Sequence, residues 1–121
     1  MFERIAGEIR SGTVLSTPVR KAQFAVFVEA DRVVFHVGNK TKINIPRVCW
    51  DGVPGFLRDK GWILIGPRFD VAPRGTLQEY LDRFWSQGKS HSSDANYVAS
   101  VLEHLGIVEV KSGRPSKIRL L

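Results

Sequence analysis

Apolar residues recur every three or four positions between residues 93 and 105, and this spacing predicts a helix with one buried face. Ser93 can accept hydrogen bonds from the free N–H groups of the first turn, and Gly106 is expected to end the helix in the left-handed conformation that glycine tolerates. Two runs rich in Val, Ile and Leu follow, at residues 107–110 and 117–121. A turn that contains Gly and Pro joins them, which predicts a β-hairpin after the helix.

A second helix is predicted upstream, where Thr76 and Glu79 have the spacing of a capping box. The polar residues 87–92 separate the two helices. The order helix, turn, helix, strand, basic turn, strand resembles the C-terminal part of the winged-helix (winged helix-turn-helix) superfamily, most closely in the segments LEHLGIVEV and GRPSKIRL. The resemblance covers about residues 76–121 and points to no single family within the superfamily. It implies a helix-turn-helix followed by a projecting hairpin, the wing.

The first half of the chain has the patterns of short strands. Residues 2–10 predict a short amphipathic helix, and residues 13–15 are compatible with a strand. Residues 22–29 and 32–37 are rich in Val and Phe, and the two residues between them predict a tight hairpin. Residues 41–45 extend it to a three-stranded meander. Because the hairpin is apolar on both faces, either both faces are covered or one face binds a partner.

The middle of the chain, residues 46–61, gives mixed signals. Several apolar residues have helical spacing, but glycines and Pro54 would interrupt a regular helix. The pattern predicts one broken helix, or a turn followed by a short helix, and then a buried strand at residues 62–65. Residues 47–65 could instead supply the first helix and strand of the winged fold.

The fold class predicted from these patterns is α+β. A β-rich N-terminal half, with a three-stranded meander and short helices, precedes a winged-helix-like C-terminal half. The corresponding units are a small α+β unit at residues 1–66, a connector at residues 67–75 and a winged-helix-like domain at residues 76–121. A chain of 121 residues and 13.6 kDa with 43% hydrophobic residues has the size and composition of a small globular protein.

The charge balance suits a polyanionic partner. Eighteen basic and twelve acidic residues give a formal net charge of +6 and a pI near 9.9. The excess is spread along the chain, so local clusters decide what it means. The predicted wing contains Lys111, Arg114, Lys117 and Arg119 and no acidic residue between them. Such a hairpin can neutralise phosphates, although solvated charge on an exposed turn is the simpler alternative.

The helix at residues 93–105 would present a polar face to DNA, and Asn96 is its best candidate for reading an adenine edge. The helix carries no Lys or Arg, and Glu103 would be repelled by the DNA backbone. A helix that faces solvent or another protein is therefore an equal alternative. The predicted nucleic-acid contacts are Lys89, Ser92, Ser93, Asn96, Tyr97, Ser100, Lys111, Arg114, Lys117 and Arg119.

Residue types that bind metals or catalyse reactions are scattered. His36, His91 and His104 lack the spacing of metal ligands on a helix, and no glycine-rich phosphate loop is present. Cys49 is the only cysteine, and no motif points to a partner that would activate it. The sequence therefore predicts no metal, no cofactor, no small-molecule ligand and no enzymatic activity.

Three functional hypotheses remain open. The first is a small non-enzymatic protein that binds double-stranded DNA, such as a transcriptional regulator. The second is a protein-interaction or assembly module that uses a winged fold without DNA contact. The third is a single-stranded nucleic-acid binder whose N-terminal sheet stacks bases on Phe24, Phe27 or Phe35. The two-sided hairpin predicts a homodimer. The sequence shows neither a membrane-length apolar run nor a secretory signal, so a cytoplasmic location is expected.

Overall fold

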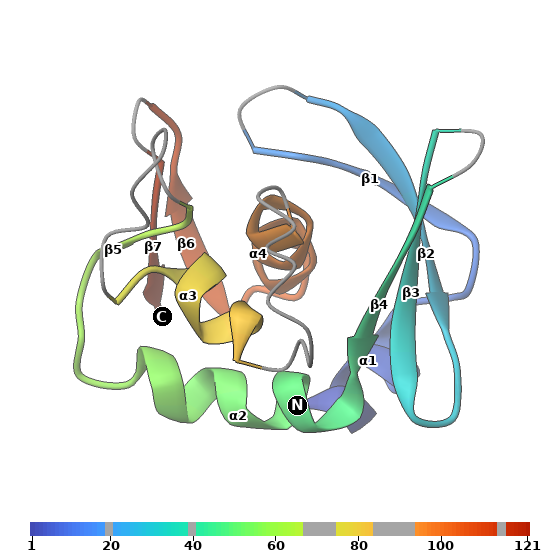
Figure 1. Cartoon of the computed structure of the whole chain (residues 1–121), viewed down its shortest axis with the longest axis horizontal. Coiled ribbons are helices and arrows are strands. Elements are labelled where there is room, and N and C mark those ends of the chain that lie inside the picture. The colour runs from blue at the N-terminus through green and yellow to red at the C-terminus, as the bar shows by residue number, and fades with distance from the viewer. Residues whose placement is uncertain (19–20, 39–40, 67–74, 84–93, 114–115) are drawn as a thin grey trace.

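The protein has an α+β structure in which one helix, α4, lies between two antiparallel sheets (Figure 1). This computed structural model describes residues 1–18, 21–38, 41–66, 75–83, 94–113 and 116–121. The elements in chain order are α1 (Phe2–Glu8), β1 (Thr13–Ser16), β2 (Gln23–Val28), β3 (Arg32–Val37), β4 (Thr41–Pro46), α2 (Arg47–Leu57), β5 (Ile63–Leu64), α3 (Leu77–Asp82), α4 (Asp94–His104), β6 (Val108–Lys111) and β7 (Lys117–Leu120).

The N-terminal sheet is an antiparallel meander with the strand order β1-β2-β3-β4. The sequence predicts a three-stranded meander and a possible strand at residues 13–15, and the structure places that segment, as β1, at the edge of the same sheet. Leu15 of β1 lies opposite Phe24 of β2 and extends the apolar face of the sheet. Leu15 also packs against the hydrophobic core, which favours the pairing of so short a segment.

Side chains alternate between the two faces of this sheet, and one face is covered by helices. The inner face packs against α2 and α4 through residues that are at most 2% exposed: Phe24, Val26, Val33, Phe35 and Ile45. No helix of the described residues lies over the opposite face (Figure 1). Of the side chains on this opposite face, Val34 is only 5% exposed, and Ala25, Phe27 and His36 are half-buried. That this face binds a partner stays a prediction.

Residues 47–57 form one continuous helix, α2, although the sequence predicts a broken helix or a turn followed by a short helix. Pro54 removes a backbone N–H, and proline in a helix interior costs about 3 kcal/mol. Each large apolar side chain contributes about 1.5–3 kcal/mol when fully buried, so the packing of α2 offsets this cost. The side chains that α2 buries are Cys49, Trp50, Val53 and Leu57.

The C-terminal sheet has the strand order β5-β7-β6. β6 and β7 form the predicted hairpin, with Val110 opposite Ile118. β5 is shorter than the strand predicted at residues 62–65, because only two of its residues pair with β7. Trp62 is not buried as expected but is 38% exposed.

The structure confirms two predicted helix boundaries. The side-chain oxygen of Thr76 accepts a hydrogen bond from the backbone N–H of Glu79 at 3.0 Å, as expected for the capping box of α3. Gly106 follows α4 with a φ of 72°, in the left-handed region. Ser93, the predicted cap of α4, lies outside the described residues. No described helix combines the length and the apolar composition of a membrane span.

One hydrophobic core connects the two halves of the chain, and its members come from both sheets and from the four helices. Because β5 pairs with β7, residues 63–64 belong to the C-terminal sheet. The division into units at residues 1–66 and 76–121 stays a prediction. Of the predicted connector, residues 67–75, the structure describes only Gly75.

Candidate nucleic-acid interface

Helix α4 is packed on two sides, which the sequence did not predict. Tyr97 is 8% exposed and Ser100 is 6% exposed. The Tyr97 ring meets the Phe24 ring edge-on, with the centroids 4.9 Å apart. The Ser100 hydroxyl donates a hydrogen bond to the carbonyl oxygen of Ser16 at 2.7 Å. Tyr97 and Ser100 were expected to face DNA, and the structure places both against the N-terminal sheet instead.

The reason for this difference is the second sheet. Apolar spacing identifies the side of α4 that packs on the C-terminal hairpin, and the polar residues on the other side predict exposure to solvent. The inner face of the N-terminal sheet covers that side as well, so the aromatic ring of Tyr97 joins the core and Ser100 satisfies its hydroxyl on a backbone carbonyl. Within the described part of α4, Asn96 is half-buried, and only Glu103 and His104 are exposed.

The predicted contacts on the wing are exposed, but they differ in their partners. Lys111 and Lys117 have no ion-pair partner among the described residues. The Arg119 guanidinium donates to the Glu109 carboxylate at 3.0 and 2.7 Å and lies 4.7 Å from the centroid of the Trp62 ring. Arg119 is therefore already neutralised. The remaining predicted contacts lie outside the described residues: Lys89, Ser92, Ser93 and Arg114.

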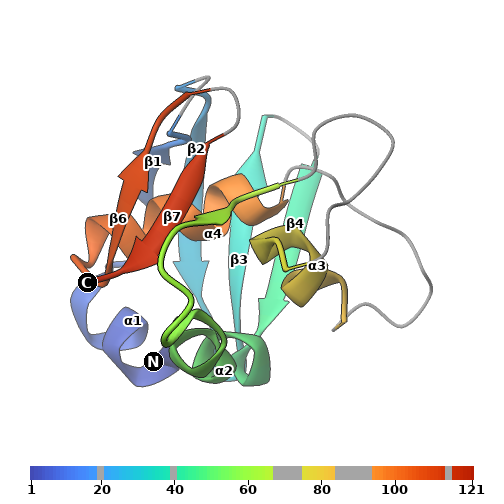
Figure 2. The same cartoon turned by 90° about the vertical axis from the view of Figure 1, so that its left-hand side faces the viewer.

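The strand ends next to three turns, those that connect β1 to β2, β3 to β4 and β6 to β7, lie at the same end of the molecule (Figures 1 and 2). The Ser112 hydroxyl in the wing donates to the carbonyl oxygen of Pro18 in the β1–β2 turn at 3.3 Å, which ties two of these turns together. We call the exposed lysines that flank the three turns the basic end. They are Lys21, Lys42, Lys111 and Lys117, and none has an ion-pair partner among the described residues.

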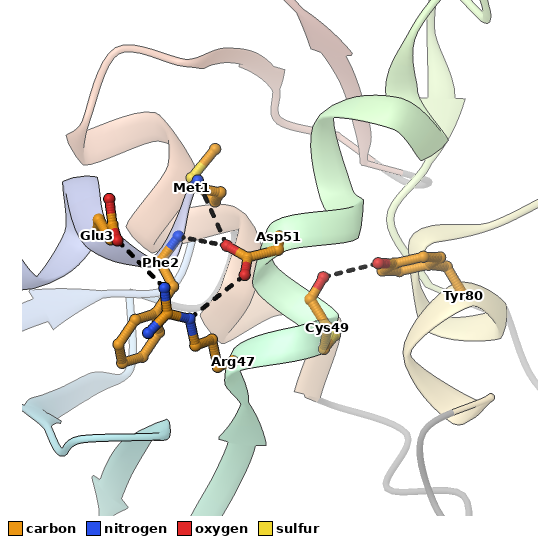
Figure 3. Close-up of polar contacts among 7 residues, drawn as sticks. All are labelled: Met1, Phe2, Glu3, Arg47, Cys49, Asp51 and Tyr80. Atoms are coloured by element: carbon orange, nitrogen blue, oxygen red, sulfur yellow. Dashed lines mark hydrogen bonds and ion pairs between the residues drawn. The ribbon is translucent and has the colours of Figure 1, made fainter.

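The opposite end of the molecule, formed by α1 and α2, is also rich in charge but is internally neutralised (Figure 3). Arg47 pairs with Glu3 at 3.2 Å and with Asp51 at 3.5 Å. Asp51 also accepts a hydrogen bond from the backbone N–H of Phe2 at 3.0 Å. This hydrogen bond, helped by nearby positive charges, lowers the pKa of the Asp51 carboxyl. The arginine of this cluster is therefore less available to a phosphate than the lysines of the basic end.

A buried contact links α2 to α3 (Figure 3). The Tyr80 hydroxyl donates to the carbonyl oxygen of Cys49 at 2.7 Å. Gly52 allows this approach, because a β-carbon at that position would collide with the Tyr80 hydroxyl. Burial raises the pKa of the Cys49 thiol to about 12, so the thiol is protonated at neutral pH. The arrangement stabilises the fold and does not make Cys49 a nucleophile.

Two residues of the basic end, Lys21 and Lys42, were missed by the sequence reasoning. A signal was present: residues 17–22 and 38–42, like residues 111–117, contain basic residues and no acidic residue. Alternate turns of an antiparallel meander lie at the same end of the sheet, so the first two segments are neighbours by topology. Only the packing of α4 brings the wing beside them.

The comparisons with known proteins do not indicate what the interface binds. No protein-family model, no curated protein and no solved structure matches the chain. Within the described ranges, no three His, Cys, Asp or Glu side chains are grouped closely enough to hold a metal ion.

Proposed function

We propose that this chain is a non-enzymatic protein that binds duplex DNA by its phosphate backbone, through the basic end and not through α4. The observation that carries the proposal is that four exposed lysines of two different sheets flank strand connections at one end of the molecule. Lys21 precedes β2, and Lys42, Lys111 and Lys117 lie near the ends of β4, β6 and β7. No carboxylate of the described residues pairs with any of them. Their charge is therefore available to an external anion.

The residue type and the exposure decide which feature of DNA is bound. Lysine ammonium groups interact with phosphates as point charges, and the release of condensed counterions supplies sequence-independent affinity. Reading of bases would require polar side chains that reach a groove edge. The four lysines that define the basic end are point charges of this kind, so we expect similar affinities for duplexes of different sequence.

The proposal includes a winged helix-turn-helix topology for residues 47–121. The order α2, β5, α3, α4, β6, β7 and the strand order β5-β7-β6 support it. In helix-turn-helix proteins the second helix of the motif enters the major groove. Here the N-terminal sheet occupies that side of α4, so in this proposal the wing and the neighbouring turns make the DNA contacts instead.

The burial of α4 favours one alternative, an assembly module with a winged fold that does not bind DNA. In this alternative the sheet has replaced DNA as the partner of α4 within the same chain. The lysines of the basic end would then be solvated surface charge. A DNA titration separates the two hypotheses, because only the first requires binding at low salt.

The test is a fluorescence anisotropy titration of a labelled duplex at several salt concentrations. We expect Lys117→Ala to weaken binding to all duplexes alike and to lower the magnitude of the salt slope by about one unit. The matched control is Arg58→Ala, which removes one exposed positive charge at the end of α2, away from the basic end. Absence of binding at low salt, or equal losses in both variants, would contradict the proposal.

A further inference from the structure

The outer face of the N-terminal sheet points away from α4 and combines apolar, aromatic and basic side chains. We define it by six residues that the strand register places on this side: Val14, Ala25, Phe27, Val34, His36 and Lys42. One row of neighbouring residues crosses the four strands. In the order of the strands, it contains Val14, Ala25, His36 and Lys42. Phe27 lies opposite Val34 in the next row.

The structure separates three phenylalanines that the sequence treated as equal candidates for base stacking. Phe24 and Phe35 point inward and are at most 2% exposed, so they belong to the core. Phe27 is half-buried on the outer face, beside the similarly half-buried His36 ring, with centroids 4.3 Å apart and planes tilted by 39°. Val14, on the edge strand of the same face, is 58% exposed.

The ring of Phe27 favours a nucleic-acid base as the occupant of the outer face. Flat aromatic rings on a small sheet surface suit a few unpaired nucleotides, because every base has a face that can stack.

The charges on and around the outer face also favour an anionic occupant. Lys42 is exposed in the row that contains His36, and none of the six residues of the face is acidic. The nearest row toward the β2–β3 turn contains Glu29, and Arg32 neutralises it through an ion pair at 3.0 Å. Two copies packed by this face would find no carboxylate for Lys42 within it. A phosphate backbone supplies the complementary charge.

We propose that the outer face binds single-stranded nucleic acid, with a base stacked on Phe27 beside His36 and a neighbouring phosphate paired with Lys42. This goes beyond duplex binding, because it assigns a different nucleic-acid form to a different surface and does not depend on the wing. Lys42 also belongs to the basic end, so the two surfaces adjoin at β4.

The experiment is an anisotropy titration of labelled oligo-dT, twelve nucleotides long, at low salt. Removal of a stacking ring weakens binding by roughly 5- to 100-fold, and we expect this loss for Phe27→Leu, which keeps an apolar side chain. Phe27→Tyr keeps the ring and should bind as the parent does. Val48→Ala, the matched control, removes an exposed apolar side chain of α2 outside this face and should also leave binding unchanged. Melting curves of each variant monitor the fold.

The same variants, titrated with a duplex, separate this proposal from the proposed function. We expect Phe27→Leu to leave duplex binding unchanged, whereas the double variant Lys111→Ala and Lys117→Ala weakens it. Oligo-dT that fails to bind, or that binds Phe27→Leu as tightly as the parent, overturns the proposal for the outer face whatever the duplex does. A dimer in light scattering that dissociates in Phe27→Leu also overturns it, because the face would then be the interface of the homodimer that the sequence predicts.

Discussion

Helix α4 and the wing lie next to each other in the sequence and were both expected to contact DNA, but the structure gives them opposite environments. Tyr97 and Ser100 of α4 are buried against the N-terminal sheet, whereas Lys111 and Lys117 of the wing are exposed and unpaired among the described residues. The polar appearance of a helix face does not establish that it is accessible. Exposure and the absence of an acidic partner are the properties that identify an available cation.

The largest expected effect tests the buried side of this comparison. Replacing Tyr97 by alanine removes a ring that packs on Phe24 and Phe35, and such a change costs about 3–5 kcal/mol of unfolding free energy. Asn96→Ala, on the same helix but half-buried, should cost less than about 0.5 kcal/mol. Urea denaturation of both variants measures the difference. Equal stability of the two variants would show that α4 is not packed as described.

A charge reversal tests the exposed side. Lys111→Glu combined with Lys117→Glu replaces two attractions for phosphate by two repulsions, and we expect duplex binding to weaken by roughly 100-fold at low salt. The matched control, Arg58→Glu with Lys60→Glu, changes the net charge equally at the end of α2. Anisotropy titrations should show a much smaller loss for the control. Similar losses would mean that net charge, and not its placement, governs binding.

A smaller change distinguishes a structural role of α4 from a DNA-reading role. Ser100→Ala leaves the Ser16 carbonyl without its hydroxyl donor and should destabilise the fold by about 1 kcal/mol. Duplex affinity should not change, because the Ser100 hydroxyl is turned toward the sheet. Denaturation and anisotropy on the same preparation give both values. A loss of duplex affinity with unchanged stability would indicate that Ser100 contacts DNA.

The smallest effect concerns the paired charges at the α1–α2 end. The Asp51 pKa is lower in the folded state than in the unfolded state, so its contribution to stability is present above the unfolded pKa of about 3.9 and is lost as pH falls through the folded value. Asp51→Asn should therefore lose less stability between about pH 5 and pH 3 than the parent does. Thermal melts across this range provide the measurement, and parallel curves would contradict the pairing of Asp51 with Phe2 and Arg47.

Local patterns predicted most of the elements, because each depends on residues close in sequence. The capping box at Thr76, the left-handed Gly106 and the hairpin of β2 and β3 are examples. The continuous α2 was not predictable in this way, because its packing overrides the local effect of Pro54. The second packed side of α4 depends on a sheet some seventy residues away in sequence.

In the candidate interface, too, the features that depend on nearby residues were predictable and those that depend on distant residues were not. Exposure of the wing lysines followed from a turn with Gly and Pro, which is local information. Neutralisation of Arg119 by Glu109 depends on the register of β6 and β7, and the addition of Lys21 and Lys42 depends on which turns share one end of the molecule. Local sequence patterns therefore did not predict which residues pair across strands or how the sheets are arranged.

The most direct test of the central claim is an NMR footprint of the protein with a short duplex. If the basic end holds DNA, the backbone amide signals of Lys21, Lys42, Lys111 and Lys117 should shift as duplex is added, and those of α4 should stay in place. The same residues should respond to duplexes of different sequence. Shifts concentrated at Asn96 and along α4, with the turns unchanged, would contradict the account.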